Sequence, residues 1–111
     1  MKDNKSQTPR PDANELAVLI DSWAIDKGLD KADPHKQYLK VAEEAGEIAA
    51  GLARSDREKI MDGIGDTNVT LRVLALTLGT TLEECTELAY NEIKHRTGKM
   101  VDGIFVKSSD L

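Results

Sequence analysis

The sequence predicts an all-α fold, an antiparallel bundle of about four helices that ends in a short extended or hairpin tail. Helix-capping motifs recur along the chain, and apolar residues between them are spaced by three and four positions. Hydrophobic residues make up 40% of the chain but aromatic residues only 4%, which favours closely packed helices over a β-sandwich. A chain of 111 residues supports one modest core. We therefore expect a flexible segment at 1–11, one helical domain at 12–98 and a tail at 99–111.

The first two helices are predicted from caps and apolar stripes. Asp12 followed three residues later by Glu15 indicates the start of a helix, and the apolar spacing that follows runs to Gly28. Asp33 followed by Pro34 starts a second helix, because Asp accepts hydrogen bonds from free amides and Pro suits the first helical position. Its apolar stripe comprises Tyr38, Val41, Ala42, Ala45, Ile48, Ala49 and Leu52.

A third helix is expected to start at a capping box formed by Ser55 and Glu58 and to end at Gly79. One of its faces carries Ile60, Ile64, Leu71, Leu74, Ala75 and Leu78. Val69, Val73 and Leu76 make its other side apolar too, and a small lone bundle has too few helices to cover both sides. The sequence therefore predicts a homo-oligomer that assembles through its helices.

The fourth helix is predicted from a capping box at Thr81 and Glu84 and is expected to continue to Gly98. After it, Asp102-Gly103 lies between short apolar segments, which is a hairpin signal. The tail is thus either a small hairpin or simply extended.

Charge and cysteine content restrict the classes of function. Twenty acidic and fifteen basic residues give a formal net charge of −5, without a Lys/Arg block suited to a nucleic acid backbone. A single cysteine, Cys85, forms no intramolecular disulfide, and the first residues lack a signal-peptide pattern. No apolar stretch approaches the length of a membrane span. We expect a cytoplasmic protein that binds neither nucleic acid polymers nor membranes.

Acidic residues of the second and third helices form the main candidate site. Glu43, Glu44 and Glu47 lie on a common side of one helix, while Asp62 and Asp66 lie one turn apart on the next. If these helices form an antiparallel hairpin, the two acidic groups should meet.

Crowded carboxylates repel one another unless a cation neutralises them, and oxygen ligands without His or Cys favour Mg²⁺, with Mn²⁺ as the alternative. Such a site can polarise a phosphoryl group and activate water, so it suits phosphoanhydride hydrolysis. The alternative is that these acids are ordinary solvated helix faces. Gly46, Gly63 and Gly65 lie inside the same helices, where small residues allow a helix or a ligand to approach closely.

Five further residues are candidates for substrate binding. Lys94 and Arg96 could contact phosphate oxygens near Asn91, although basic residues at the end of a helix also complement its dipole. Lys40, one turn before the glutamates, has the same two interpretations. Trp23 could stack on a base, with a place in the core as the alternative. His35, His95 and Cys85 have no partners at metal-ligand spacing and are given no chemical role.

The runs Lys40–Ile48, Ile64–Asp66 and Asn91–Arg96 resemble the MazG-like nucleoside triphosphate pyrophosphohydrolases, in the short single-domain branch. The resemblance covers roughly residues 12 to 107. It implies an all-α dimer or tetramer in which an EExxE stretch and an ExxD stretch bind Mg²⁺. It also implies hydrolysis of a ribo- or deoxyribonucleoside triphosphate to the monophosphate and pyrophosphate, as in nucleotide pool cleaning.

By this resemblance Glu43, Glu44 and Glu47 are metal ligands, with Glu43 and Glu44 also catalytic, and Asp66 is the final acid of the second stretch. The glutamate expected three residues before it is replaced by Gly63, with Asp62 one position earlier. Either Asp62 supplies that ligand or the site uses fewer carboxylates. The resemblance also favours Asn91, Lys94 and Arg96 near the phosphates. The alternative function is a non-catalytic helical bundle that binds nucleotides or other proteins.

Overall fold

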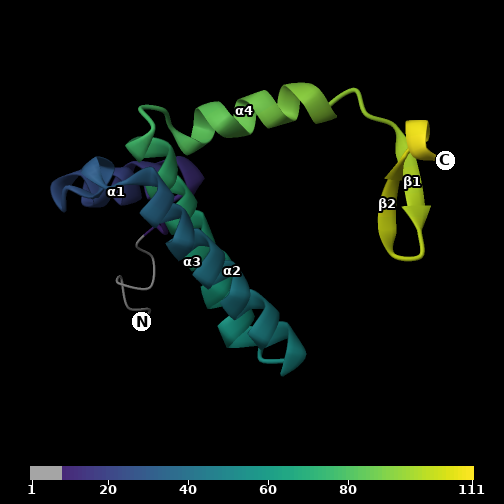
Figure 1. Ribbon diagram of the computed structural model, residues 1–111, viewed down its shortest axis with the longest axis horizontal. Helices are drawn as coiled ribbons and strands as arrows, with labels where there is room; N and C mark the ends of the chain where they lie inside the picture. Colours follow the sequence, from purple (N-terminus) through teal and green to yellow (C-terminus); the bar gives the residue numbers. More distant parts are fainter. Residues whose placement is uncertain (1–8) are drawn as a thin grey trace, which may run out of the picture.

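The computed structural model describes residues 9–111, so most of the segment predicted to be flexible, 1–11, lies outside the described residues. The described chain is mainly helical and ends in a small antiparallel hairpin (Figure 1). Its elements are α1 (Ala13–Asp26), η2 (Leu29–Lys31), α2 (Pro34–Ala53), α3 (Arg57–Thr77), α4 (Leu82–Ile93), β1 (Gly98–Val101), β2 (Ile104–Lys107) and η3 (Ser108–Asp110). The predicted helical fold is confirmed at this level, and the tail is a hairpin.

Three of the predicted helix starts carry the expected side-chain caps. The backbone amide of Glu15 donates to the Asp12 carboxylate at 2.8 Å, and the Asp12 amide donates back to Glu15 at 3.1 Å. Asp33 accepts from the His35 amide at 2.8 Å, and the Thr81 hydroxyl accepts from the amide three residues on at 3.1 Å. These bonds satisfy amides that have no partner inside the helix.

Two predicted boundaries are wrong. The N-cap of α3 is Asp56, whose carboxylate accepts from the Lys59 amide at 3.1 Å, and not Ser55. Ser55 instead adopts a left-handed backbone conformation, φ 53°, that reverses the chain between α2 and α3. The fourth helix ends at Ile93 rather than near Gly98, because Gly98 begins β1 opposite Lys107.

The centre of the fold is the antiparallel pair α2 and α3, which lie side by side along their length (Figure 1). Two buried glycines allow this approach. A Cβ atom on Gly51 would lie 3.0 Å from Cγ1 of Ile60, and one on Gly63 would lie 2.9 Å from Cγ1 of Ile48. The amide of buried Gln37 adds a hydrogen bond to the Thr70 carbonyl at 3.1 Å, so this register is fixed at both ends.

The core of the described chain is small: its buried apolar residues are Ala24, Val41, Val73 and Ala75. Helix α1 crosses one end of the α2–α3 pair, and α4 leaves from that same end, carrying the hairpin away from the other helices (Figure 1). Many large apolar side chains consequently remain exposed. Among the described residues, no helix is both long and apolar enough to cross a membrane.

We expect Gly63→Ala to destabilise the protein by about 1–3 kcal/mol, because the new methyl group collides with Ile48 across the helix pair. Gly65→Ala is the matched control, since a Cβ there meets no atom within 4 Å. Without such a collision, Ala should raise helix stability by about 0.5–1 kcal/mol. Urea denaturation measures both changes, and equal effects of the two substitutions would contradict the close packing at Gly63.

Candidate functional site

The five predicted carboxylates line one small pocket between α2 and α3. Its volume is about 300 Å³. It is lined by Glu43, Glu44, Glu47, Lys59, Asp62, Gly63 and Asp66. Acids from two helices therefore meet, as expected from their spacing on each side of the turn.

The electrostatics of the pocket are dominated by Glu44. Its pKa is raised above the usual range, first by desolvation and then by the negative charges of Asp66, Glu43, Glu47 and Asp62. Each of these effects disfavours the ionised form of Glu44. The pocket therefore carries an excess of negative charge that a bound cation would relieve.

Lys59 partly offsets this charge. Its Nζ lies 2.7 Å from Oε2 of Glu47, and this hydrogen bond lowers the pKa of Glu47. The sequence analysis missed Lys59, although its position one turn before Asp62 places it on the same face of α3 as Asp66. Within residues 9–111, no three His, Cys, Asp or Glu side chains converge closely enough to hold a metal ion in these conformations.

The structure gives a physical reason for Gly63 within the acidic stretch of α3. Gly63 is buried, and any Cβ there would contact the side chain and backbone of Ile48 on α2. A glutamate cannot occupy this position without separating the helices. Asp62, one residue earlier, lines the pocket. This turn of α3 therefore keeps an acidic residue at Asp62, while Gly63 keeps the close packing against α2.

The candidate substrate-binding residues are not at the acidic pocket of the same chain. Lys40 is exposed on α2, and Trp23 on α1 is 49% exposed; neither lines the pocket. Lys94 Nζ donates to Asn91 Oδ1 at 3.2 Å, and Arg96 pairs with Glu92 at 3.3 Å. This second group lies at the far end of α4, which points away from α2 and α3 (Figure 1).

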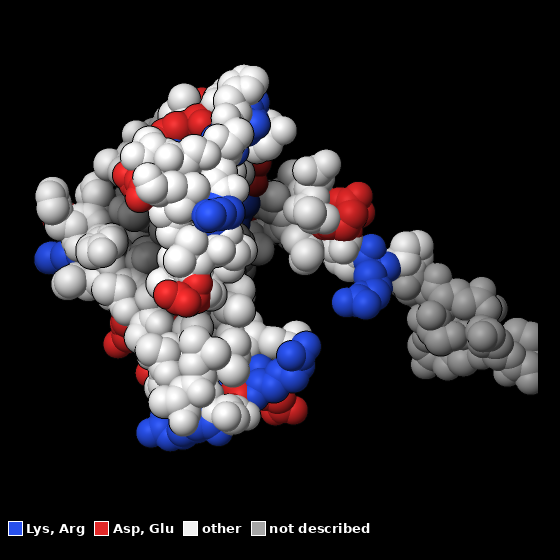
Figure 2. Space-filling view, turned by 90° about the vertical axis from the view of Figure 1, so that its right-hand side faces the viewer, with Lys and Arg blue, Asp and Glu red and all other residues white. Residues whose placement is uncertain are grey.

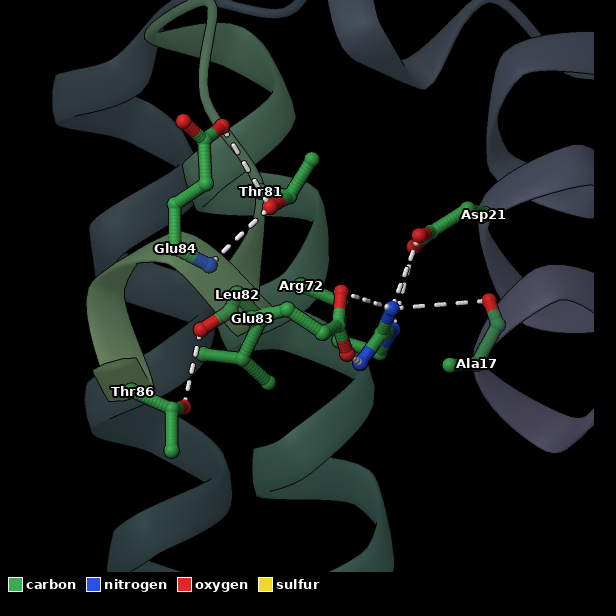
Figure 3. Close-up of polar contacts among 8 residues, drawn as sticks. All are labelled: Ala17, Asp21, Arg72, Thr81, Leu82, Glu83, Glu84 and Thr86. Atoms are coloured by element: carbon green, nitrogen blue, oxygen red, sulfur yellow. Dashed lines mark hydrogen bonds and ion pairs between the residues drawn. The ribbon is translucent and has the colours of Figure 1, made fainter. Parts of the chain in front are cut away.

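A second polar cluster, also missed by the sequence analysis, joins α1, α3 and α4 around Arg72 (Figure 3). The Arg72 side chain is only 5% exposed. Its guanidinium donates to both oxygens of Asp21, at 3.0 and 2.7 Å, and to both oxygens of Glu83, at 2.6 and 2.9 Å. The signal present in the sequence was a charged residue within the otherwise apolar stretch 71–76 of α3. This ion network holds α1 and α4 against α3 and so fixes their orientations relative to it.

The charges in this network support one another. The hydrogen bonds that Arg72 donates to Glu83 and Asp21 raise its already high pKa, and the same bonds to Arg72 lower the pKa of Glu83. Arg72 and Glu83 therefore remain charged near neutral pH. Arg72 and Glu83 also line a larger groove between α1, α3 and α4, whose volume is about 1060 Å³. Asp62 and Asp66 line both cavities, so the groove opens beside the acidic pocket.

Comparison with known proteins gives one informative match. The chain is 38% identical over 65 residues to an 18.2 kDa protein from the rep-hol intergenic region of Haemophilus phage HP1, described as uncharacterized. The match covers 58% of this chain and 40% of that protein. No family model matches the chain, and no solved structure does.

Replacing Arg72 with Met should destabilise the fold by about 3 kcal/mol, because Asp21 and Glu83 lose their shared partner. Arg96→Met is the control, since its exposed pair with Glu92 should contribute less than about 1 kcal/mol. Chemical denaturation compares them. A cost for Arg72→Met no larger than that for the control would contradict a structural role for the network.

The same network predicts a dependence of stability on pH. Since the pKa of Glu83 is lowered in the folded state, its contribution is complete above the ordinary value of 4.5 and is lost as pH falls below it. Denaturation measured from pH 7 downwards should therefore show an acid loss of stability that is smaller in Arg72→Met. An identical acid loss in both proteins would argue against the Arg72–Glu83 pair as its source.

Glu44→Gln should stabilise the metal-free protein at neutral pH, because it removes a charge disfavoured by burial and by four neighbouring acids. In the wild type, stability should fall as pH rises through the raised pKa of Glu44, and the variant should lack this fall. Thermal denaturation in chelator tests this, with Glu58→Gln, an exposed acid of the first turn of α3, as control. A variant less stable than wild type would show that the carboxylates are not crowded.

Proposed function

We propose that the protein is a Mg²⁺-dependent nucleoside triphosphate pyrophosphohydrolase of the MazG-like type. The observation that carries this proposal is the pocket that five acidic residues from two antiparallel helices line. The raised pKa of Glu44 supports it, because crowded carboxyl groups with shifted pKa values are typical of sites that bind a cation. The helical fold with its α2–α3 pair is compatible with the proposed family.

The donor set fits magnesium. The pocket offers carboxylate oxygens without imidazole or thiolate, which excludes a typical zinc site. Mg²⁺ is commonly held by one or two carboxylates together with water and substrate phosphates, so a preformed cage of three side chains is not required. Bound there, Mg²⁺, or Mn²⁺ in its place, would neutralise phosphate charge and polarise the phosphoryl group.

We assign the acids of the pocket two kinds of role in this reaction. Glu44, Glu47, Asp62 and Asp66 would hold the cation, and Glu43 would orient water and accept its proton. Water adds its oxygen to phosphorus, and the bond between the α and β phosphates breaks. The products are a nucleoside monophosphate and pyrophosphate, a reaction that serves nucleotide pool cleaning.

Lys59 gains a role in this scheme. Its ammonium group neutralises Glu47 at 2.7 Å while the pocket contains no cation. A cation that binds Glu47 would release Lys59, which could then contact a phosphate oxygen. Lys59 thus balances the charge of Glu47 in the metal-free pocket and the charge of a phosphate group in the substrate-bound pocket.

A non-catalytic bundle is the second candidate. The pairing of Glu47 with Lys59 and the lack of three converging metal-ligand side chains in residues 9–111 favour it. In that case the acids serve solubility, and the large exposed apolar surface serves assembly or binding of another protein.

The deciding experiment is release of pyrophosphate from a panel of ribo- and deoxyribonucleoside triphosphates, with Mg²⁺ and with chelator. We expect Mg²⁺-dependent release from one or a few of them. Glu47→Gln and Asp66→Asn should lower kcat by at least about 100-fold, since each removes a cation ligand. Glu58→Gln should retain wild-type activity, and Asp62→Asn tests whether Asp62 replaces the acid absent at Gly63. No release across the panel by folded protein would favour the non-catalytic bundle, and full activity of the Glu47 and Asp66 variants would contradict the site.

A further inference from the structure

Lys59 is the one basic side chain, among the described residues, that lines the acidic pocket between α2 and α3. Basic side chains gather at the turn end of the α2–α3 pair, the lower end in Figure 1 and Figure 2, where the segment 54–59 contains Arg54, Arg57 and Lys59. The Arg54 guanidinium donates to the Ala50 carbonyl of α2 at 3.4 Å, and neither arginine lines the pocket. The pocket therefore has one positive charge of its own.

The ammonium group of Lys59 is bound to one acid of the pocket in particular. Its Nζ donates to Oε2 of Glu47 at 2.7 Å, a charge-assisted hydrogen bond that joins α3 to α2. Elsewhere in residues 9–111, no ion pair joins these two helices. The carboxylate of Glu47 is therefore already paired with a cation that belongs to the protein.

The charge of the remaining acids has no such compensation. Within the described chain, no ion pair engages the other acids that line the pocket, at positions 43, 44, 62 and 66. The pKa of Glu44 is raised, first by desolvation and then by the charge of Asp66, whereas the hydrogen bond from Lys59 lowers the pKa of Glu47. The pocket thus combines an uncompensated region around Glu44 and Asp66 with a compensated one at Glu47.

The packing of the helices makes the pairing of Glu47 important for cation binding. A Cβ atom at position 63 would lie 2.9 Å from Cγ1 of Ile48, so α3 contributes two acids to the pocket and has no room for a third there. In the conformations described for residues 9–111, no three acids converge to hold a metal ion, and Glu47 is bound to Lys59. A cation that binds Glu47 has first to displace the Lys59 ammonium group.

The exposure of the pair makes this displacement feasible. The side chain of Lys59 is 37% exposed and that of Glu47 is 50% exposed. An ion pair this accessible contributes little to the stability of the fold. The flexible four-carbon stem of lysine also lets the ammonium group move into water without a shift of the backbone. The pair is therefore not required for folding, and its main effect falls on what binds in the pocket.

We propose that Lys59 is an autoinhibitory counter-ion that competes with the divalent cation for Glu47 and so weakens binding of the free cation. This inference rests on the cation site of the proposed function. A triphosphate that binds the released Lys59 favours the displacement, so the cation and the nucleotide strengthen each other's binding. Lys59 thus makes the pocket take up the cation together with the substrate rather than alone.

Titration of the full chain with Mn²⁺, followed by the paramagnetic resonance signal of the free ion, tests the competition without nucleotide. Lys59→Met removes the competing charge and should bind Mn²⁺ about threefold to tenfold more tightly than wild type. Lys59→Arg keeps the charge and should bind no more tightly than wild type. Arg54→Met is the matched control, because Arg54 acts on Glu47 through its charge at a distance and not through a hydrogen bond. It should change the affinity less than about twofold.

Equal affinities of wild type and Lys59→Met, or an equal gain in Arg54→Met, would overturn the proposal. Asp66→Asn separates this outcome from a failure of the proposed function. If wild type binds Mn²⁺ saturably and Asp66→Asn does not, the cation site stands whatever the effect of Lys59→Met. If neither wild type nor Lys59→Met binds Mn²⁺, the cation site itself is refuted, and the competition with it.

The coupling to nucleotide is tested by repeating the titration with a non-hydrolysable nucleoside triphosphate analogue. The analogue should strengthen Mn²⁺ binding by a smaller factor in Lys59→Met than in wild type, because the variant has no competing charge to release. An equal factor in the two proteins would contradict the coupling through Lys59.

Acetylation of wild-type lysines gives a measurement that does not depend on how a variant folds. The intact protein is treated briefly with an N-hydroxysuccinimide ester, and the modification of each lysine is measured by mass spectrometry. Saturating Mg²⁺ should raise the acetylation of Lys59, because the released amine is more accessible to the reagent. Lys36, exposed in the first turn of α2, should react equally with and without Mg²⁺. Unchanged acetylation of Lys59 would show that the cation does not displace it.

Discussion

The close approach of α2 and α3 at Gly51 and Gly63 determines much of this structure. Because no Cβ atom separates the helices there, the side chains of Ile48 and Ile60 pack directly on the opposite helix backbone. The helix faces on one flank of this contact then bring Glu44 and Asp66 to one pocket. Packing and carboxylate crowding are therefore coupled: a wider helix pair would relieve the charge repulsion and would also disperse the candidate metal ligands.

Arg72 provides the second constraint. By pairing with Asp21 and Glu83, it fixes α1 and α4 on the same end of α3. A salt bridge with this little exposure costs desolvation, so its contribution is to specify one arrangement of three helices. In that arrangement α1, α3 and α4 line the apolar groove, and α4 points away from the α2–α3 pair (Figure 1). The small core of the described residues and the position of the hairpin, away from the other helices, follow from it (Figure 1).

Most of the secondary structure could be predicted from local sequence patterns, because N-cap residues such as Asp12, Asp33 and Thr81 act within one helical turn. The meeting of the five acids was also predictable, since helical spacing and a short turn determine it. The start of α3 was missed because Ser55 and Asp56 are both good caps, and only the left-handed conformation of Ser55 selects between them. Arg72, Lys59 and the direction of α4 depend on contacts between distant elements, which periodicity does not encode.

The central claim is that the acidic pocket binds a divalent cation. Mn²⁺ can report this directly, because the paramagnetic resonance signal of the free ion is lost on binding, and titration of wild type against Asp66→Asn localises the site. We expect saturable binding by wild type that is strengthened by a non-hydrolysable nucleoside triphosphate analogue and weakened in the variant. Absence of saturable binding, with and without the analogue, or equal binding by the two proteins, would contradict the account.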